Sequence, residues 1–318
     1  MSKIKAIVSL GDALAQLTGR QIKKLAEKLG LDPKRNLSEN QLRTAVADEG
    51  QKFIKQIDAI KNNSDIISTS DFLELDKSDK GKYSILTFDD GLLDHYNILD
   101  ILMGKQAVGT FFIPCEAVVE RKMVLSHKIQ FILAAVDEKK LVSYIRDKLN
   151  DFNRDLWNKY SVSKWKNNWW SPEMVFVTNV LRNHHQGKEI TNDLFDNFVT
   201  SNEKEICADF YLNTSQLEEL VSNGMEIGGH GHLSENLSTL SLDMVEEEIL
   251  KSSEFVSEYY TKHRSFSYPN GGYNDSVLKY MKQYGYDLAF TTKQKPLEMD
   301  QFDPLTIPRY DASQWSFV

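Results

Sequence analysis

The stretch from residue 83 to residue 114 has the pattern of a strand, a helix and a second strand, and no other feature limits the fold as strongly. We predict strands over residues 83–88 and 109–114, with an amphipathic helix between them that ends near Gly104. Two strands joined by a helical crossover run parallel. The alternation resumes over residues 212–291. The sequence therefore predicts an α/β fold, with a parallel sheet or a (β/α) barrel.

Two segments fall outside this alternation. Residues 1–62 are predicted to form an N-terminal helical segment, and residues 63–318 a barrel domain with a helical insertion over about 116–211. The insertion is rich in tryptophan. It is either a helical layer with an aromatic core or a platform on which sugar rings stack. It leaves and re-enters at strand–helix junctions, so we expect it beside the barrel mouth. It holds four of the five tryptophans, namely Trp157, Trp165, Trp169 and Trp170.

The charge and the cysteines narrow the function classes. The 318 residues carry a net charge of -8, which disfavours a nucleic-acid-binding surface because phosphate binding needs clustered lysine and arginine. Cys115 and Cys207 match no metal-binding spacing and are expected to be buried, reduced thiols. The N-terminus lacks a secretory pattern, and no run of about 18 apolar residues occurs. We therefore expect a cytoplasmic protein without a membrane span.

Polar residues cluster where the predicted strands end. Asp89 and Asp90 follow the first strand, His230 follows a later one, and a turn over residues 268–272 follows the next. In parallel barrels the carboxyl ends of the strands form one rim, which carries the catalytic residues. Two adjacent carboxylates are costly to bury unless cations pair with them. A divalent metal and an arginine would supply that charge, with His230 as an imidazole ligand.

Six short motifs, in order along the chain, resemble those of the polysaccharide deacetylase family of carbohydrate esterases. They are TFDDG at 87–91 with Asp94, GTFFI at 109–113, EIGGH at 226–230, FSYPNG at 266–271, FTT at 290–292 and IPRYD at 307–311. The resemblance covers residues 83–115 and 212–311. It implies a distorted (β/α) barrel with fewer units than the common eight. The insertion resembles that of members found with bacterial surface-glycan biosynthesis.

The resemblance also implies a chemistry, the metal-assisted removal of an N-acetyl group from an amino sugar. It makes Asp89 the general base and Asp90 and His230 metal ligands, with a divalent cation, expected to be zinc, as the cofactor. A metal-bound water has a pKa of about 7, and a carboxylate that takes its proton adds about 10² to 10⁴ in rate. The residues expected to contact the sugar are Tyr268, Pro269, Asn270 and Trp170.

Two departures from the family pattern leave alternatives open. Ser234 replaces the second histidine of the motif, and the nearest imidazole is that of His232, two residues after His230. If the chain is extended there, both rings share a face and can reach one metal. Otherwise water or Ser234 completes the site, or no metal binds. A late histidine expected to act as general acid is also missing. The arginine expected to pair with the base is Arg264 or, nearer the rim, Arg309.

The predicted function is that of a metal-dependent carbohydrate N-deacetylase in bacterial surface polysaccharide biosynthesis, such as that of lipopolysaccharide or capsule. Its expected partner is an amino sugar or glycan, with no nucleic acid. The alternative is a barrel that has lost hydrolysis and binds glycans or acts as a scaffold. The intact Asp89–Asp90 pair favours the enzyme, whereas Ser234 and the missing late histidine favour the alternative.

Overall fold

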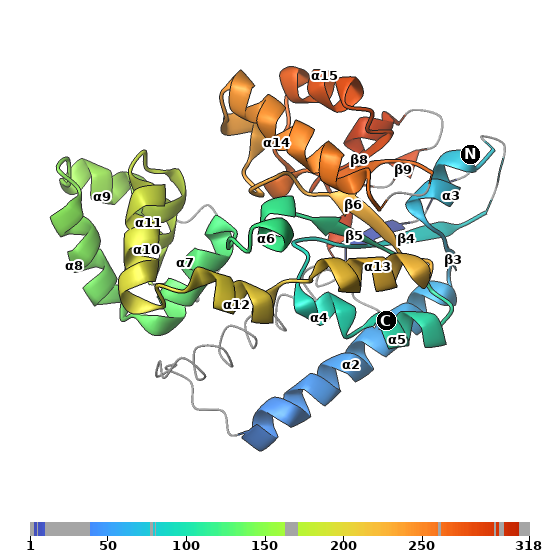
Figure 1. Ribbon diagram of the computed structural model, residues 1–318, viewed down its shortest axis with the longest axis horizontal. Coiled ribbons are helices and arrows are strands. Elements are labelled where there is room, and N and C mark those ends of the chain that lie inside the picture. The colour runs from blue at the N-terminus through green and yellow to red at the C-terminus, as the bar shows by residue number, and fades with distance from the viewer. Residues whose placement is uncertain are drawn as a thin grey trace. The chain divides into compact units, whose positions relative to one another are not determined.

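The computed structural model describes residues 3–4, 6–9, 39–76, 79, 81–162, 171–259, 262–295, 297–298 and 302–311. These residues fall into two compact units (Figure 1). The barrel unit comprises the described residues within 1–18, 37–122 and 207–318, and the helical unit comprises those within 123–206. In the part of the chain that the structure describes, no helix is both long enough and apolar enough to cross a membrane.

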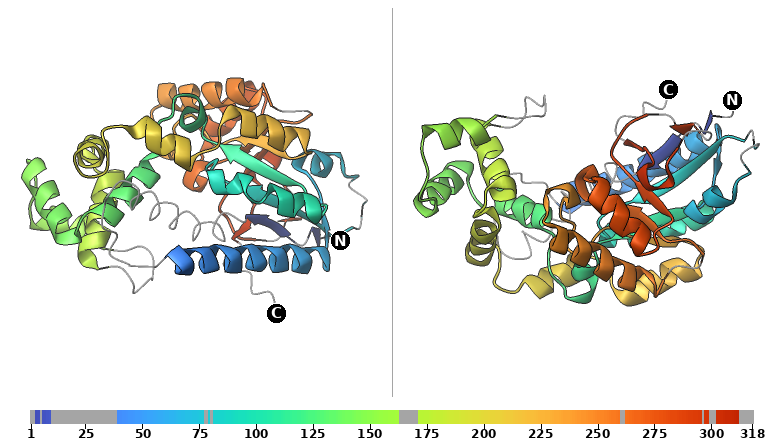
Figure 2. Two further views of the ribbon diagram at one scale, coloured as in Figure 1. Left: turned by 60° about the horizontal axis from the view of Figure 1, so that its bottom comes forward. Right: turned by 90° about the horizontal axis from the view of Figure 1, so that it is seen from above.

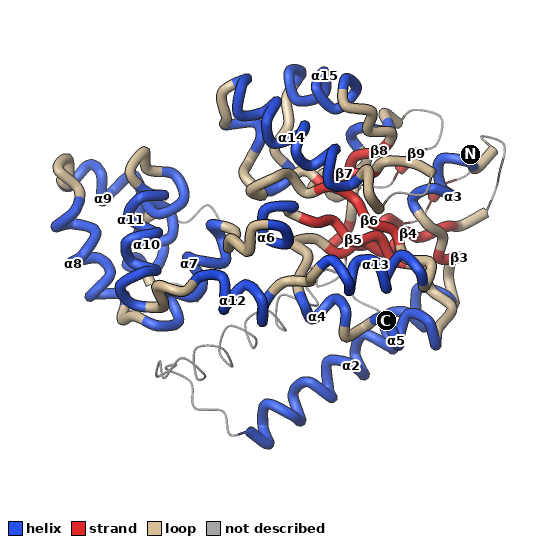
Figure 3. The backbone as a smooth tube through the Cα atoms, viewed as in Figure 1, coloured by secondary structure: helices blue, strands red, loops and turns tan. Residues whose placement is uncertain are grey.

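One parallel sheet forms the centre of the barrel unit (Figure 3). Its strands follow the order β10-β2-β4-β5-β6-β7-β8, and β3 also pairs with β4. Every pair in it is parallel. A separate antiparallel pair joins β1 (Lys3–Ile4) to β9 (Leu297–Glu298). The strands of the sheet are β2 Ala6–Ser9, β3 Asp65–Ile66, β4 Tyr83–Phe88, β5 Gly109–Ile113, β6 Glu226–Gly229, β7 Ser265–Ser267, β8 Leu288–Phe290 and β10 Tyr310–Asp311.

The central strands are buried because helices cover the outer face of the sheet. Residues of β5 are all buried, and so are all residues of β4 after Tyr83, which is the usual state of parallel strands. Phe88 stacks on Phe111 at a centroid distance of 4.7 Å, and Phe53 and Ile57 of α2 belong to the same core. Figure 2 shows α2, in blue, running alongside the sheet. The helices are α2 Glu39–Lys61, α3 Thr69–Glu74, α4 Leu93–Tyr96, α5 Leu99–Gly104, α6 Cys115–Val119, α13 Thr214–Ser222, α14 Leu242–Val256 and α15 Asp275–Gln283, with 3₁₀ turns η1 Leu237–Thr239, η2 Pro269–Gly271 and η3 Pro304–Thr306.

The last described segment of the chain pairs with both edges of the sheet. Ile307 forms a parallel bridge with Phe290 of β8, and its amide donates to the carbonyl oxygen of Ala289 at 2.8 Å. Three residues later, β10 begins and pairs with β2 at the opposite edge. The sheet thereby curls into a distorted (β/α) barrel. This confirms the predicted fold class.

The N-terminal prediction was wrong in part. Residues 39–61 are helical, but residues 6–9, which we had included in a helical segment over 1–62, form strand β2 beside β4. Four residues of apolar and β-branched character are too few to show a period, and their pairing with residues 84–87 is not visible in a local pattern. The helix predicted from Thr18 to Gly30 lies outside the described residues.

The described residues of the helical unit contain helices and no strand. Trp157 stacks on Phe176 at 4.6 Å, so this partly buried tryptophan packs against a core residue of the unit. The domain boundaries and the placement of the insertion beside the barrel mouth stay predictions. The helices are α7 Leu125–Ala135, α8 Glu138–Lys148, α9 Arg154–Tyr160, α10 Pro172–Asn183 and α11 Gly187–Phe198, and α12 Glu203–Phe210 leads back into the barrel unit.

Candidate active site

The acidic pair stands at the carboxyl end of β4, on a tight turn. Asp90 has φ +74° and the following Gly91 has φ +61°, so the chain turns sharply through two left-handed residues. A non-glycine residue in this region is uncommon and often marks a functional site. The two carboxylates then contact different partners: Asp89 pairs with Arg309, and Asp90 lies near His230.

Arg309 holds Asp89 in a two-pronged ion pair. Its two terminal nitrogens donate to the two carboxylate oxygens of Asp89, each at 2.9 Å. The guanidinium also donates to Thr87 Oγ1 at 3.2 Å, to Ser267 Oγ at 2.9 Å and to the Thr291 carbonyl at 3.2 Å. Burial alone would raise the pKa of Asp89, but the charges of Arg309 and His230 outweigh it and hold that pKa below its ordinary value. Asp89 is therefore ionised at neutral pH.

His230 follows β6 and presents one ring nitrogen to Asp90. Its Nδ1 lies 2.8 Å from the carbonyl oxygen of Ser267, and because a carbonyl only accepts, Nδ1 carries the hydrogen. Nε2 then faces Asp90 Oδ1 at 3.5 Å. The ring is 6 % exposed and the Asp90 side chain 32 %, so the pair is open on the carboxylate side. An oxygen and a nitrogen donor converge here, and this set suits a divalent cation such as zinc.

His232 does not join this pair. We expected it to share a face with His230 on an extended chain, but Gly231 between them has φ +76°. The His232 ring instead lies beside α6 and α14: its Nδ1 is 3.2 Å from Cys115 Sγ, and Lys251 donates to its Nε2 at 3.2 Å. Both ring nitrogens are thus engaged. Burial lowers the pKa of His232, so the ring is neutral at pH 7.

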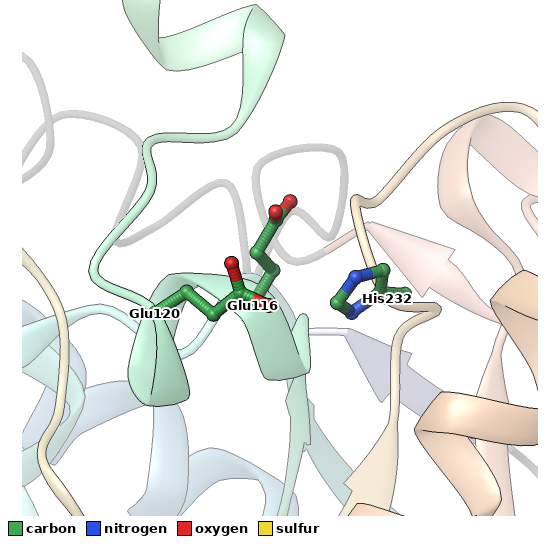
Figure 4. Close-up of side chains that lie close together, drawn as sticks. All are labelled: Glu116, Glu120 and His232. Atoms are coloured by element: carbon green, nitrogen blue, oxygen red, sulfur yellow. The ribbon is translucent and has the colours of Figure 1, made fainter.

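His232 belongs to a second cluster, shown in Figure 4. One ligand atom from each of Glu116, Glu120 and His232 lies within 4.8 Å of the others, the one such group among the residues that the structure describes. Lys122 donates to Glu116 at 2.5 Å and to Glu120 at 3.0 Å, so a lysine already balances these carboxylates. Both glutamates belong to α6 or its last turn, and sequence reasoning had singled out neither.

One comparison with known proteins bears on the resemblance to the deacetylase family. Residues 175–289 match the sequence model of the polysaccharide deacetylase family. Over this segment, which is about a third of the chain, the sequence is similar to a polysaccharide deacetylase domain. This confirms the resemblance predicted from the motifs and, with it, the expected class of enzyme, a carbohydrate N-deacetylase. The match includes His230; Asp89, Asp90 and Arg309 lie outside it and are brought to His230 by the fold.

Three solved structures of deacetylases overlap the chain. The deacetylase PplD of Streptococcus pyogenes in complex with acetate is 15% identical, with 82% of this chain and 80% of that chain covered and a TM-score of 0.49. IcaB from Ammonifex degensii is 15% identical over 84% and 85%, with a TM-score of 0.47. The BpsB deacetylase domain from Bordetella bronchiseptica is 12% identical over 81% and 83%, with a TM-score of 0.47. No curated protein sequence matches the chain.

The residues expected to contact the sugar differ from one another in burial. Tyr268 is 1% exposed, and its hydroxyl donates to the Leu305 carbonyl at 2.9 Å, so the side chain belongs to the core and is not open to a sugar. Pro269 is buried and Asn270, with φ +54°, is exposed. Their role in substrate binding stays a prediction. Trp170 lies outside the described residues.

Sequence reasoning missed Ser267, which contacts three residues of the candidate site. Its hydroxyl lies 3.1 Å from Asp89 Oδ2, in addition to its contacts with Arg309 and His230. The sequence did contain a signal for this role, since Ser267 lies between two aromatic residues of a predicted strand. A hydroxyl buried in such a strand needs a hydrogen-bond partner.

Proposed function

We propose that the chain is a metal-dependent hydrolase that removes an N-acetyl or similar acyl group from an amino sugar. The observation that carries the proposal is the ionised Asp89, held by Arg309, next to the Asp90–His230 pair at the carboxyl ends of β4 and β6. A base and a pair of metal ligands side by side are what metal-assisted amide hydrolysis requires.

Asp90 and His230 are the residues that would hold the cation, which we propose to be zinc. When bound, such a cation polarises the amide carbonyl and lowers the pKa of its water to about 7. Catalytic zinc sites usually have three protein ligands. Both His232 nitrogens contact other groups, so among the described residues we propose two protein ligands here, Asp90 and His230, with water or Ser234 completing the set.

Asp89 acts as the general base in this proposal. Its carboxylate accepts the proton of the attacking water, and Arg309 keeps it ionised and fixed in direction. The substrate class is an amino sugar or glycan of a bacterial surface polysaccharide. The family match supports the carbohydrate; the polysaccharide pathway, such as lipopolysaccharide or capsule assembly, and the cytoplasmic location stay predictions.

The test measures acetate release from N-acetylglucosamine oligomers together with Zn²⁺ binding by calorimetry. We expect Asp89→Asn to keep Zn²⁺ affinity and lose most turnover, because Asp89 acts on water rather than on the cation. Asp90→Asn should lose both. Equal loss of Zn²⁺ binding in the two variants would refute this division of roles.

A matched control separates the two acidic clusters. The double variant Glu116→Gln/Glu120→Gln removes the carboxylates beside His232 and leaves Asp90 and His230 in place. We expect it to bind Zn²⁺ and release acetate like the wild type. If it abolishes both while Asp90→Asn keeps both, the cation site is the Glu116 cluster. Glycan binding without acetate release by the wild type would instead favour the binding-protein alternative.

A further inference from the structure

Ser267 hydrogen-bonds to both halves of the proposed site, the Asp89–Arg309 pair and His230. Its hydroxyl contacts Asp89 and Arg309, at 3.1 and 2.9 Å, and its carbonyl oxygen contacts His230 at 2.8 Å. The residue is fully buried in β7, the strand between β6 and β8. We propose that Ser267 is a positioning residue that fixes the direction of the base relative to the metal-binding imidazole. The inference rests on the proposed function and deepens it.

The direction of the hydrogen bonds follows from their donors. A guanidinium has no acceptor, so Arg309 donates to Ser267 Oγ. The single hydroxyl hydrogen of Ser267 is then directed to Asp89 Oδ2, because an ionised carboxylate only accepts. The order of donation is therefore Arg309 to Ser267 to Asp89, and the serine hydroxyl has no freedom to point elsewhere.

This arrangement makes the two oxygens of Asp89 unequal. Oδ2 accepts from both Arg309 and Ser267, whereas Oδ1 accepts one hydrogen bond from the described residues, that of Arg309. Each carboxylate oxygen has about two acceptor positions. Both positions of Oδ2 are occupied, and one on Oδ1 is left for water. Ser267 therefore selects Oδ1 of Asp89 as the oxygen that receives the proton.

The carbonyl oxygen of the same residue acts on His230. By accepting the Nδ1 hydrogen, it fixes the ring orientation and leaves Nε2 directed to Asp90. Hydroxyl and carbonyl can be separated by mutation, because Ser267→Ala removes the first and keeps the second. A loss of turnover without a loss of metal binding is the signature of the positioning role, whereas a general structural defect would affect both.

The experiment compares Ser267→Ala with a matched control, Ser265→Ala. Ser265 lies two residues earlier on the same face of β7, is equally buried, and has its hydroxyl near Gly228, away from the base. We expect Ser267→Ala to lower kcat for acetate release by about 10- to 100-fold, with KM and the Zn²⁺ dissociation constant within about twofold of the wild type. Ser265→Ala should change neither, and Ser267→Thr, which keeps the hydroxyl, should restore part of kcat.

Three outcomes would overturn the proposal: an unchanged kcat in Ser267→Ala, joint loss of kcat and Zn²⁺ affinity in it, or an equal loss of kcat in Ser265→Ala. A second measurement does not need turnover. In urea unfolding, Ser267→Ala and Asp89→Asn should be non-additive, whereas Ser265→Ala and Asp89→Asn should add. If the wild type releases no acetate, the proposed function fails, and this coupling still decides whether Ser267 positions Asp89; additivity of the first pair refutes it.

Discussion

Replacing Arg309 with methionine should strongly destabilise the barrel unit, because it leaves the Asp89 carboxylate without its counter-charge. The Arg309 side chain is 5% exposed, and methionine can occupy much of its apolar volume. What the substitution removes is the charge and the hydrogen bonds to Asp89, Thr87, Ser267 and the Thr291 carbonyl. The Asp89 carboxylate would keep one hydrogen bond, from Ser267, and an unpaired charge.

The expected magnitude follows from the burial of the pair. Removing one partner of a buried ion pair costs about 3 to 5 kcal/mol, most of it from the charge left behind. The Asp89 side chain is 22% exposed, so water can solvate part of it, and the lower end, about 3 kcal/mol, is expected. Arg309→Lys keeps the charge but cannot bond both carboxylate oxygens in the same way, and should cost about 1 to 2 kcal/mol.

The assay is urea unfolding at pH 7 with a chelator present, so that metal binding does not contribute to stability. The slope of the unfolding free energy against urea must stay the same in all variants for the comparison to hold. The variants are Arg309→Met, Asp89→Asn and the double variant. Because Asp89→Asn removes the charge that Arg309→Met leaves unpaired, the double variant should be more stable than Arg309→Met alone.

A control uses the other arginine that the sequence allowed as partner of the base. The Arg264 side chain donates to Ser253 Oγ and to the Tyr284 carbonyl, both neutral acceptors. Arg264→Met and Asp89→Asn should therefore be additive. A double variant Asp89→Asn/Arg309→Met less stable than Arg309→Met, or equal coupling of Asp89 to both arginines, would show that the buried charge does not set the cost.

Three further predictions concern stability and reactivity. Glu226→Gln should destabilise the barrel by about 1 to 3 kcal/mol in thermal or urea unfolding. The reason is that the Glu226 carboxylate accepts hydrogen bonds from the backbone amides of Thr69 and Ser70 at the start of α3. An unchanged unfolding midpoint would contradict this prediction. Burial raises the pKa of Glu248 from 4.5 to about 7. The stability that Glu248 contributes is therefore fully present below pH 4.5 and is lost as the pH rises through 7, by up to about 3 kcal/mol. Glu248→Gln should flatten the curve of unfolding free energy against pH over that range, and an unaltered slope would contradict this prediction. Burial raises the pKa of Cys115 to about 12, so a thiol reagent should modify it at the rate of unfolding, not at the rate of an exposed cysteine.

Local patterns in the sequence were enough to predict several residues of the candidate site. Asp89 and Asp90 follow a continuous apolar strand, and His230 follows a later strand. Parallel strands all end at the same edge of a sheet, so these side chains are expected at one rim. The family pattern left Arg264 or Arg309 as the partner of the base, with Arg309 nearer the expected rim, and in the structure Arg309 forms the ion pair with Asp89. The family resemblance followed from the same motifs.

Tertiary structure decided what depends on pairing between distant segments. Strand β2 pairs with β4, and residues 307–311 pair with both β8 and β2. These hydrogen bonds join segments that are far apart in the chain. Segments of only two to five residues carry no local pattern that would predict them. The contacts of Ser267 with Asp89 and His230 depend on the position of β7 between β6 and β8, which the sequence did not reveal.

His232 shows the limit of a local rule most directly. Residues two apart share a face only while the backbone stays extended, and Gly231 leaves the extended region at φ +76°. A side chain at that position would meet the carboxylate of Glu248, whose oxygen lies 2.7 Å from where a Cβ would stand, so the turn requires glycine. Glu248 then accepts the amide hydrogens of His232 and Leu233 and holds the turned segment against α14. The contact with α14 is tertiary and has no signature in the local pattern, so the sequence predicted that the His232 ring shares a face with His230, whereas in the structure its two nitrogens contact Cys115 and Lys251.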